Sequence, residues 1–193
     1  MYKYIVLMIL LYSRKMNKIV RRKNAMEEYN NDEFNWIIQP IIDNKEYQKL
    51  KEVSHHGSTR FDHSMRVAYY TYLTAKFFHL DDYQATTKAA LLHDFFIDEV
   101  KDKNIIARLR KHPSYAAEKA KEHFGLNEKQ IDIIKTHMFP ITFTPPKYIE
   151  GWIVDIVDDV VAVGEKAANL TDEFKTTVTF MFILLINFLN TKL

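Results

Sequence analysis

The chain has 193 residues, of which 47% are hydrophobic, and a formal net charge of +2 at pH 7. This length supports one core and is short for two domains, and the small net charge gives no sign of specific nucleic-acid binding. The absence of cysteine excludes disulfides and thiolate metal ligands. Because glycine and proline are scarce, we predict an all-α fold built as a single compact helical domain.

Both ends of the chain carry short apolar runs. Residues 1–31 combine the run Tyr4–Tyr12 with basic residues in a helical extension, and an internal methionine is an alternative start. Residues 169–193 contain the run Phe180–Leu189, which we interpret as a hydrophobic helix packing on the domain or on a second subunit of a homodimer. Each run is about half the length of a membrane-spanning helix. We therefore expect no transmembrane segment and a cytoplasmic location.

The domain itself is placed at residues 32–168 and begins with two short helices. These are Asp32–Ile38 and Asp43–Val53, separated by Pro40. Each starts with an aspartate, a residue type suited to capping a helix N-terminus. We expect these helices to brace the core.

A polar loop and two longer helices follow. The loop His55–Arg60 holds a histidine pair and an arginine, and loops on rigid scaffolds often carry function. In the helix Asp62–Phe78, His63 has the same helical spacing as the apolar positions and therefore points inward. The helix Asp82–Phe96 repeats this arrangement, with His93–Asp94 near its C-terminal end.

Two further helices are each expected to place a histidine near a helix end. Residues 104–111 form a helical turn or two, and His112–Pro113 then opens a helix that runs to Phe124, because proline is favoured at the first helical position. Asn127 caps the next helix, and His137 lies on its apolar face.

The last helix of the domain is predicted at Trp152–Ala167. Asp158 lies there among valines and aligns with Val154 and Val161. Asp155, one turn earlier, is the rival carboxylate, and we prefer Asp158.

Six ionisable side chains thus share helix ends or apolar faces. One inward histidine alone is usually a satisfied core residue, but several together with buried carboxylates need a compensating charge. Imidazole and carboxylate groups are ligands that divalent transition metals accept. The sequence therefore predicts a metal site formed by His63, His93, Asp94, His112, His137 and Asp158.

The order of these residues resembles that of the HD superfamily of metal-dependent phosphohydrolases, which takes its name from the His-Asp doublet. The resemblance covers about residues 50–165. It is carried by Phe61–Ala68, Ala90–Phe96, His137–Pro140 and Trp152–Asp158. The implied architecture is an all-α HD-type domain.

Carried over residue by residue, the resemblance implies two divalent ions. The ligands of the first would be His63, His93, Asp94 and Asp158, whereas His112 and His137 would hold the second, with Asp94 available as the bridge. The two extra histidines are typical of the binuclear branch, which includes hydrolases of diadenosine polyphosphates. Iron or manganese is favoured, and cobalt, nickel, zinc and magnesium are alternatives.

The implied activity is hydrolysis of a phosphoester or phosphoanhydride bond in a nucleotide-like small molecule through a metal-activated hydroxide. Asp94 would act at the metal, and Arg60, His56 and Arg66 would serve the phosphate and the leaving group. An equally weighted alternative for Arg60 is a salt bridge to Asp62 or to a neighbouring helix.

The sequence departs from the family pattern at two points. Phe95–Ile97 replaces the Ile-Gly-Lys of the cyclic-dinucleotide phosphodiesterases, which disfavours cyclic-di-GMP as the substrate. Asp159 stands where many members carry lysine. Two other functions stay open, namely a non-catalytic metal or nucleotide sensor and an interaction protein that recruits a partner through its apolar ends.

Overall fold

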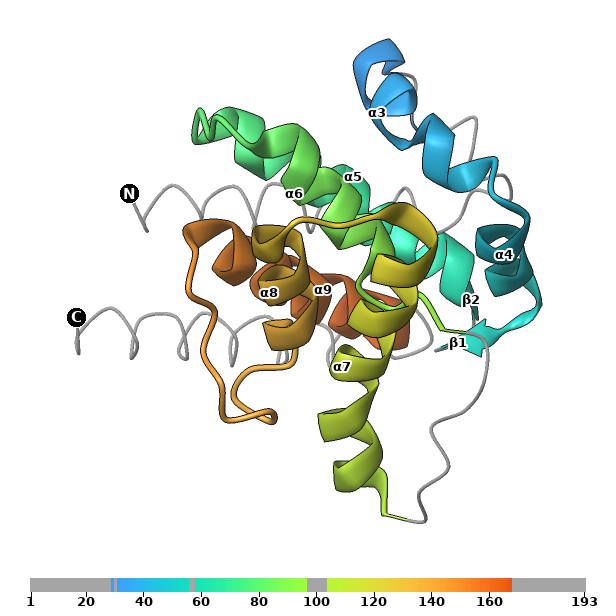
Figure 1. Cartoon of the computed structure of the whole chain (residues 1–193), viewed down its shortest axis with the longest axis vertical. Coiled ribbons are helices and arrows are strands. Elements are labelled where there is room, and N and C mark those ends of the chain that lie inside the picture. The colour runs from blue at the N-terminus through green and yellow to red at the C-terminus, as the bar shows by residue number, and fades with distance from the viewer. Residues whose placement is uncertain (1–28, 30, 56–57, 97–103, 168–193) are drawn as a thin grey trace. The chain divides into compact units, whose positions relative to one another are not determined.

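The structure, a computed structural model, describes residues 29, 31–55, 58–96 and 104–167. Helices predominate among them, which confirms the all-α class (Figure 1). A short antiparallel pair, β1 and β2, was not predicted, and it joins Ser54 to Thr59. No helix in these ranges is long and apolar enough to span a membrane. The elements are α3 (Asp32–Ile42), α4 (Lys45–Gln48), η1 (Lys49–Glu52), β1 (Ser54–His55), β2 (Ser58–Thr59), α5 (Arg60–Phe77), α6 (Tyr83–Leu92), α7 (Ile105–Phe124), α8 (Glu128–Thr136) and α9 (Ile149–Ala167).

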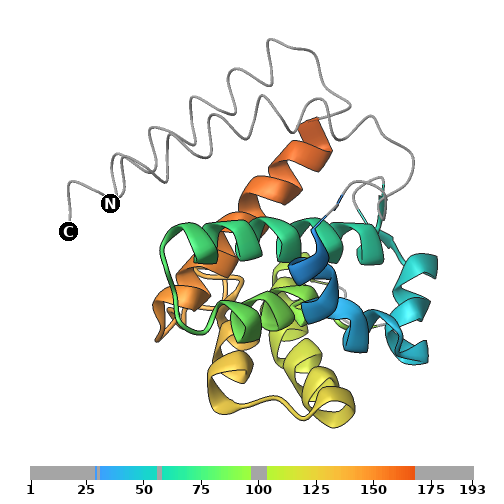
Figure 2. The same ribbon diagram turned by 90° about the horizontal axis from the view of Figure 1, so that it is seen from above.

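Residues Tyr29–Val161 form one compact unit. Inside it, α5 lies along α6, and α6 also contacts α3, α7 and α8 (Figures 1 and 2). The helix α6 therefore lies at the centre of the packing. Its inner residues are fully buried, including Ala89, Ala90, Leu91 and Leu92. The site doublet follows directly after this helix, so its backbone is anchored in the core.

The first helices differ from the prediction at their ends. Helix α3 runs past Pro40 to Ile42, and α4 is only one turn before the chain tightens into η1. The capping residues are Asn31 and Asn44, whose side chains accept hydrogen bonds from the backbone, so the prediction of aspartate caps was wrong. Asparagine and aspartate cap equally well, and composition alone does not choose between adjacent candidates.

Helix α6 is shorter than predicted, and the doublet lies outside it. His93 is the C-cap residue, and Asp94 follows in a turn. The amide of Phe95 bonds to the carbonyl of Leu92, and the amide of Phe96 to that of Asp94. These tight bonds end the helix, so the prediction that it continues to Phe96 was wrong.

Helix α7 is continuous where two helices were predicted. Pro113 lies inside it, nine residues after its N-cap Asn104, and the left-handed Gly125 ends it after Phe124, the predicted last residue. Asn127 caps α8 through a complete capping box with Gln130. Helix α9 starts at Ile149, one turn before the predicted start.

The two apolar ends lie outside the described residues. The predicted domain boundaries at residues 31 and 168, the helical extension, the C-terminal hydrophobic helix and the homodimer therefore stay predictions.

Candidate metal centre

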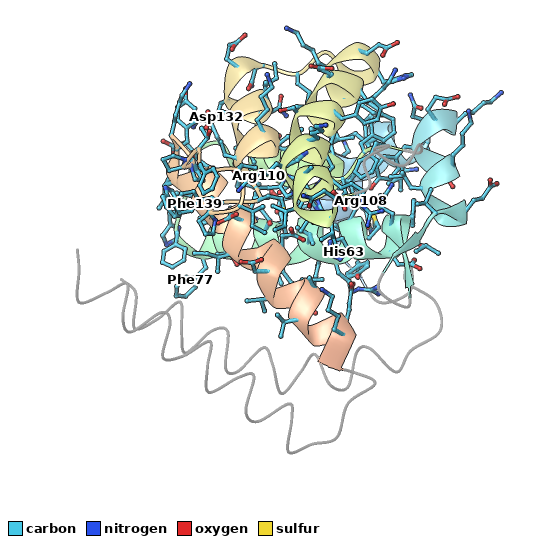
Figure 3. The ribbon with its side chains drawn as sticks, turned by 90° about the horizontal axis from the view of Figure 1, so that it is seen from below. His63, Phe77, Arg108, Arg110, Asp132 and Phe139 are labelled. Carbon is cyan, nitrogen blue, oxygen red and sulfur yellow. The ribbon has the colours of Figure 1, made fainter. Side chains whose placement is uncertain are left out.

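Five elements deliver the six predicted ligands to one place. His63 comes from the first turn of α5, His93 and Asp94 from the end of α6, and His112 from α7. The other two are His137, the C-cap residue of α8, and Asp158 on α9. All but His112, which is half-buried, are buried. Figure 3 labels His63 on α5, between the ribbons of α7 and the lower end of α9.

The first group of the cluster is built around Asp158. Its Oδ1 atom lies 2.9 Å from His63 Nε2 and 3.5 Å from His93 Nε2. The potential ligand atoms of these three residues lie within 4.8 Å of one another. Asp155 is placed differently, because its carboxyl accepts a hydrogen bond from the amide of Phe139 at 3.1 Å.

The second group is built around Asp94. Its Oδ1 atom lies 3.4 Å from His112 Nε2 and 3.8 Å from His137 Nε2. Its Oδ2 atom lies 4.0 Å from His93 Nε2. The two oxygens thus face different histidines, which is the arrangement that a bridging carboxylate needs.

The protonation of the histidine rings can be read from their backbone contacts. His93 Nδ1 donates to the carbonyl of Ala90 and His137 Nδ1 to that of Ile134, each at 2.7 Å, because a carbonyl oxygen only accepts. The ring of His112 also bonds to the backbone of Arg108. Such bonds fix the tautomer and leave the Nε2 lone pair facing the cluster, as in metal-ligating histidines.

The closest contact between two histidine rings of the cluster indicates whether a metal ion fits between them. His112 Nε2 and His137 Nε2 are 3.0 Å apart. Burial lowers the pKa of both rings, and that of His137 falls to about 3, so both are neutral near pH 7. With a backbone acceptor holding the ring proton on the other side, two lone pairs face each other. A bound metal ion would turn this repulsive contact into an attractive one, so the residues present fit a metal.

The carboxylates of the cluster are ionised. Burial alone would raise the pKa of Asp94, but His93, His112, His137 and Arg60 hold it below its ordinary value. Asp158 behaves in the same way, since His93 and His63 outweigh its burial. Burial lowers the pKa of His93, yet Asp158 and Asp94 raise it above the ordinary value. The site therefore combines ionised carboxylates with the neutral rings of His112 and His137.

Of the three residues predicted to act on the phosphate and the leaving group, the structure places one beside the cluster. Arg60 is buried beside Asp94, with Nε 3.9 Å from Asp94 Oδ2, and it donates to the carbonyl of Phe96. Arg66 lies on α5, one turn after His63. His56 lies outside the described residues.

Phe96 is a site residue that the sequence did not single out. The Arg60 guanidinium lies 3.8 Å from the centre of its ring, and the His112 ring lies 5.7 Å away. Phe96 therefore packs near both a cation and a ligand ring of the cluster. Helical spacing could not predict its contact with Arg60, because Phe96 follows the end of α6.

Comparison with known proteins yields one family. The family model described as HD domain matches residues 60–163, which include all six members of the cluster. A search of curated proteins and a search of solved structures each found no match.

Proposed function

The chain belongs to the HD domain family, and from this premise we propose that it is a metal-dependent phosphohydrolase. The observation that carries the proposal is the buried cluster, in which ionised carboxylates and imidazole rings converge from five elements. Such donor sets suit divalent ions such as iron or manganese.

We assign the ligands in two sets. His63, His93 and Asp158 would hold one ion, which the short distances to Asp158 support. His112 and His137 would hold a second, which their close Nε2 atoms support. Asp94 would bridge the two ions, because its oxygens face different histidines.

The proposed reaction is hydrolysis. When bound, two divalent ions lower the pKa of a water molecule and neutralise charge on a phosphoryl oxygen. The water gives up a proton as its oxygen bonds to phosphorus, the bond from phosphorus to the leaving oxygen breaks, and the leaving oxygen takes up a proton. Arg60 would hold Asp94 in place through its adjacent positive charge.

Arg66 and His56 are proposed to act on the substrate itself. A guanidinium stabilises non-bridging phosphate oxygens, and an imidazolium can protonate a leaving oxygen. The proposed substrate is a small nucleotide-like phosphoester or phosphoanhydride. The enclosed cluster supports a small substrate, since five of the six side chains are buried.

The test combines metal analysis with an activity screen. Protein purified without oxygen is analysed for metals and assayed on nitrophenyl phosphates, nucleotides and dinucleoside polyphosphates. We expect metal-dependent turnover that falls at least about 100-fold in His93→Ala and Asp94→Ala. The control is Asp81→Ala, which removes an exposed carboxylate. Full activity in both site variants would contradict the proposal.

A further inference from the structure

The cluster is open to solvent on one side. The side chains of His112 and Asp158 are 12% and 11% exposed, whereas those of His63, His93 and His137 are each 1% exposed. A phosphate group must therefore approach along the edge formed by His112 and Asp158. The residues around His112 on α7 are the first that it meets.

Arg108 lies one turn before His112 on α7. It precedes His112 by four residues, so both stand on the same face of α7, about 6 Å apart along the axis. Its side chain is half-buried, and its backbone bonds to the His112 ring. Within the described ranges, no acidic side chain pairs with its guanidinium. A half-buried cation of this kind is poorly solvated and calls for an anionic partner.

The neighbouring arginines are already engaged by the protein. Arg60 stacks on Phe96 and donates to its carbonyl. Arg110 donates to the carbonyl of Ile141 at 3.0 Å, and its guanidinium lies 4.4 Å from the centre of the Phe143 ring. In Figure 3, Arg108 lies on the side of α7 where His63 is seen, and Arg110 on the side of Phe139. Of these three arginines, only Arg108 lies one turn from the partly exposed His112 and has a guanidinium that no acidic side chain of the described residues pairs with.

We propose that Arg108 binds the non-bridging oxygens of the substrate phosphate beside His112. A guanidinium presents paired N–H donors that match two phosphate oxygens, which a point charge such as lysine cannot do equally well. This inference rests on the proposed function and deepens it, because it assigns recognition of a dianionic phosphate to a residue outside the ligand set.

The experiment measures binding of inorganic phosphate to the metal-loaded full-length protein by isothermal titration calorimetry. We expect Arg108→Ala to weaken the phosphate Kd about tenfold or more, as the loss of a charge-assisted hydrogen bond implies. Arg108→Lys should recover part of the affinity. Lys121→Ala is the matched control, because it removes an exposed charge from the same helix and should leave Kd unchanged.

Metal content and thermal unfolding are measured for every variant. Arg108→Ala with its metal retained and with wild-type affinity for phosphate would overturn the inference, as would wild-type protein that binds metal but no phosphate. The two proposals fail separately. Phosphate binding that depends on Arg108, without turnover of any phosphoester, contradicts only the proposed function. Turnover with an unchanged KM in Arg108→Ala contradicts only the role of Arg108.

Discussion

Asp155 shows how one turn of helix separates two carboxyls into different chemical states. Burial, together with the nearby charge of Asp159, raises the pKa of Asp155 to about 8, whereas Asp158 is ionised beside His63 and His93. The neutral carboxyl of Asp155 accepts the amide of Phe139, two residues after His137. It thereby ties the end of α8 to α9 without adding a further negative charge.

We predict that Asp155→Asn stabilises the protein at pH 8. Between pH of about 4 and about 8 the unfolded chain loses a proton that the folded chain keeps, so the wild-type protein loses stability as pH rises. Asparagine removes this loss and keeps the acceptor for Phe139. Chemical denaturation should show a gain on the order of 2 kcal/mol at pH 8 and little gain at pH 4. Equal stability of Asp155→Asn and the wild-type protein at pH 8 would contradict this prediction.

His137 is a proposed ligand of the second ion, so its substitution tests whether that ion is bound. We predict that His137→Asn lowers the metal content from about two ions per chain to about one, because the ring supplies a nitrogen ligand that asparagine replaces poorly. Elemental analysis measures the ratio. His123→Asn is the control, because His123 packs against Phe95 and lies outside the cluster. An unchanged metal content in His137→Asn would contradict the assignment.

At the scale of helices, Glu33 joins α3 to α5 and α6. It accepts hydrogen bonds from Tyr72 at 2.6 Å and Tyr83 at 2.7 Å, and it pairs with Lys76. The bond to Lys76, followed by those to Tyr72 and Tyr83, lowers the pKa of Glu33 to about 2. This contact fixes α3 against the two helices that carry His63 and the doublet.

We predict that Glu33→Gln lowers the melting temperature at pH 7. The ionised form of Glu33 stabilises the folded state above its ordinary pKa of 4.5, and this contribution is lost as pH falls towards 2. The difference in melting temperature between variant and wild type should therefore become smaller as the pH decreases. Thermal unfolding from pH 7 to pH 2 measures this difference, and the control is Glu118→Gln, which changes an exposed side chain on α7. A gap that does not depend on pH would exclude the ionic contribution.

The sequence predicted the helices better than their ends. The spacing of apolar residues placed His63 and Asp158 on inward faces, because apolar residues at helical spacing mark the face that a helix buries. It failed where single hydrogen bonds decide, as at Phe95, whose amide ends α6, and at Pro113, which α7 accommodates. The hydrogen bond of Arg60 to the carbonyl of Phe96 could not be predicted either, because Phe96 follows the end of α6.

For the whole molecule, the cluster joins distant parts of the chain. Removing the metal would leave ionised carboxylates and closely spaced lone pairs inside the core. We predict that a chelator lowers the melting temperature of wild-type protein by about 5 to 10 °C, as expected for loss of a tightly bound ligand. Differential scanning calorimetry measures it. Asp94→Asn should respond weakly to the chelator, and a wild-type protein that loses its metal without a shift would contradict the prediction.

The contact between His63 and Asp158 spans 95 residues of sequence. An ion held by both would close a loop of that length, and long closed loops restrict the unfolded chain most. In a chain without cysteine, the ion would then take the part that a disulfide plays in secreted proteins. Because Asp158 is synthesised last among the six, the ribosome must finish α9 before the cross-link can form. Loading of the ion held by His63, His93 and Asp158 would therefore follow translation of α9.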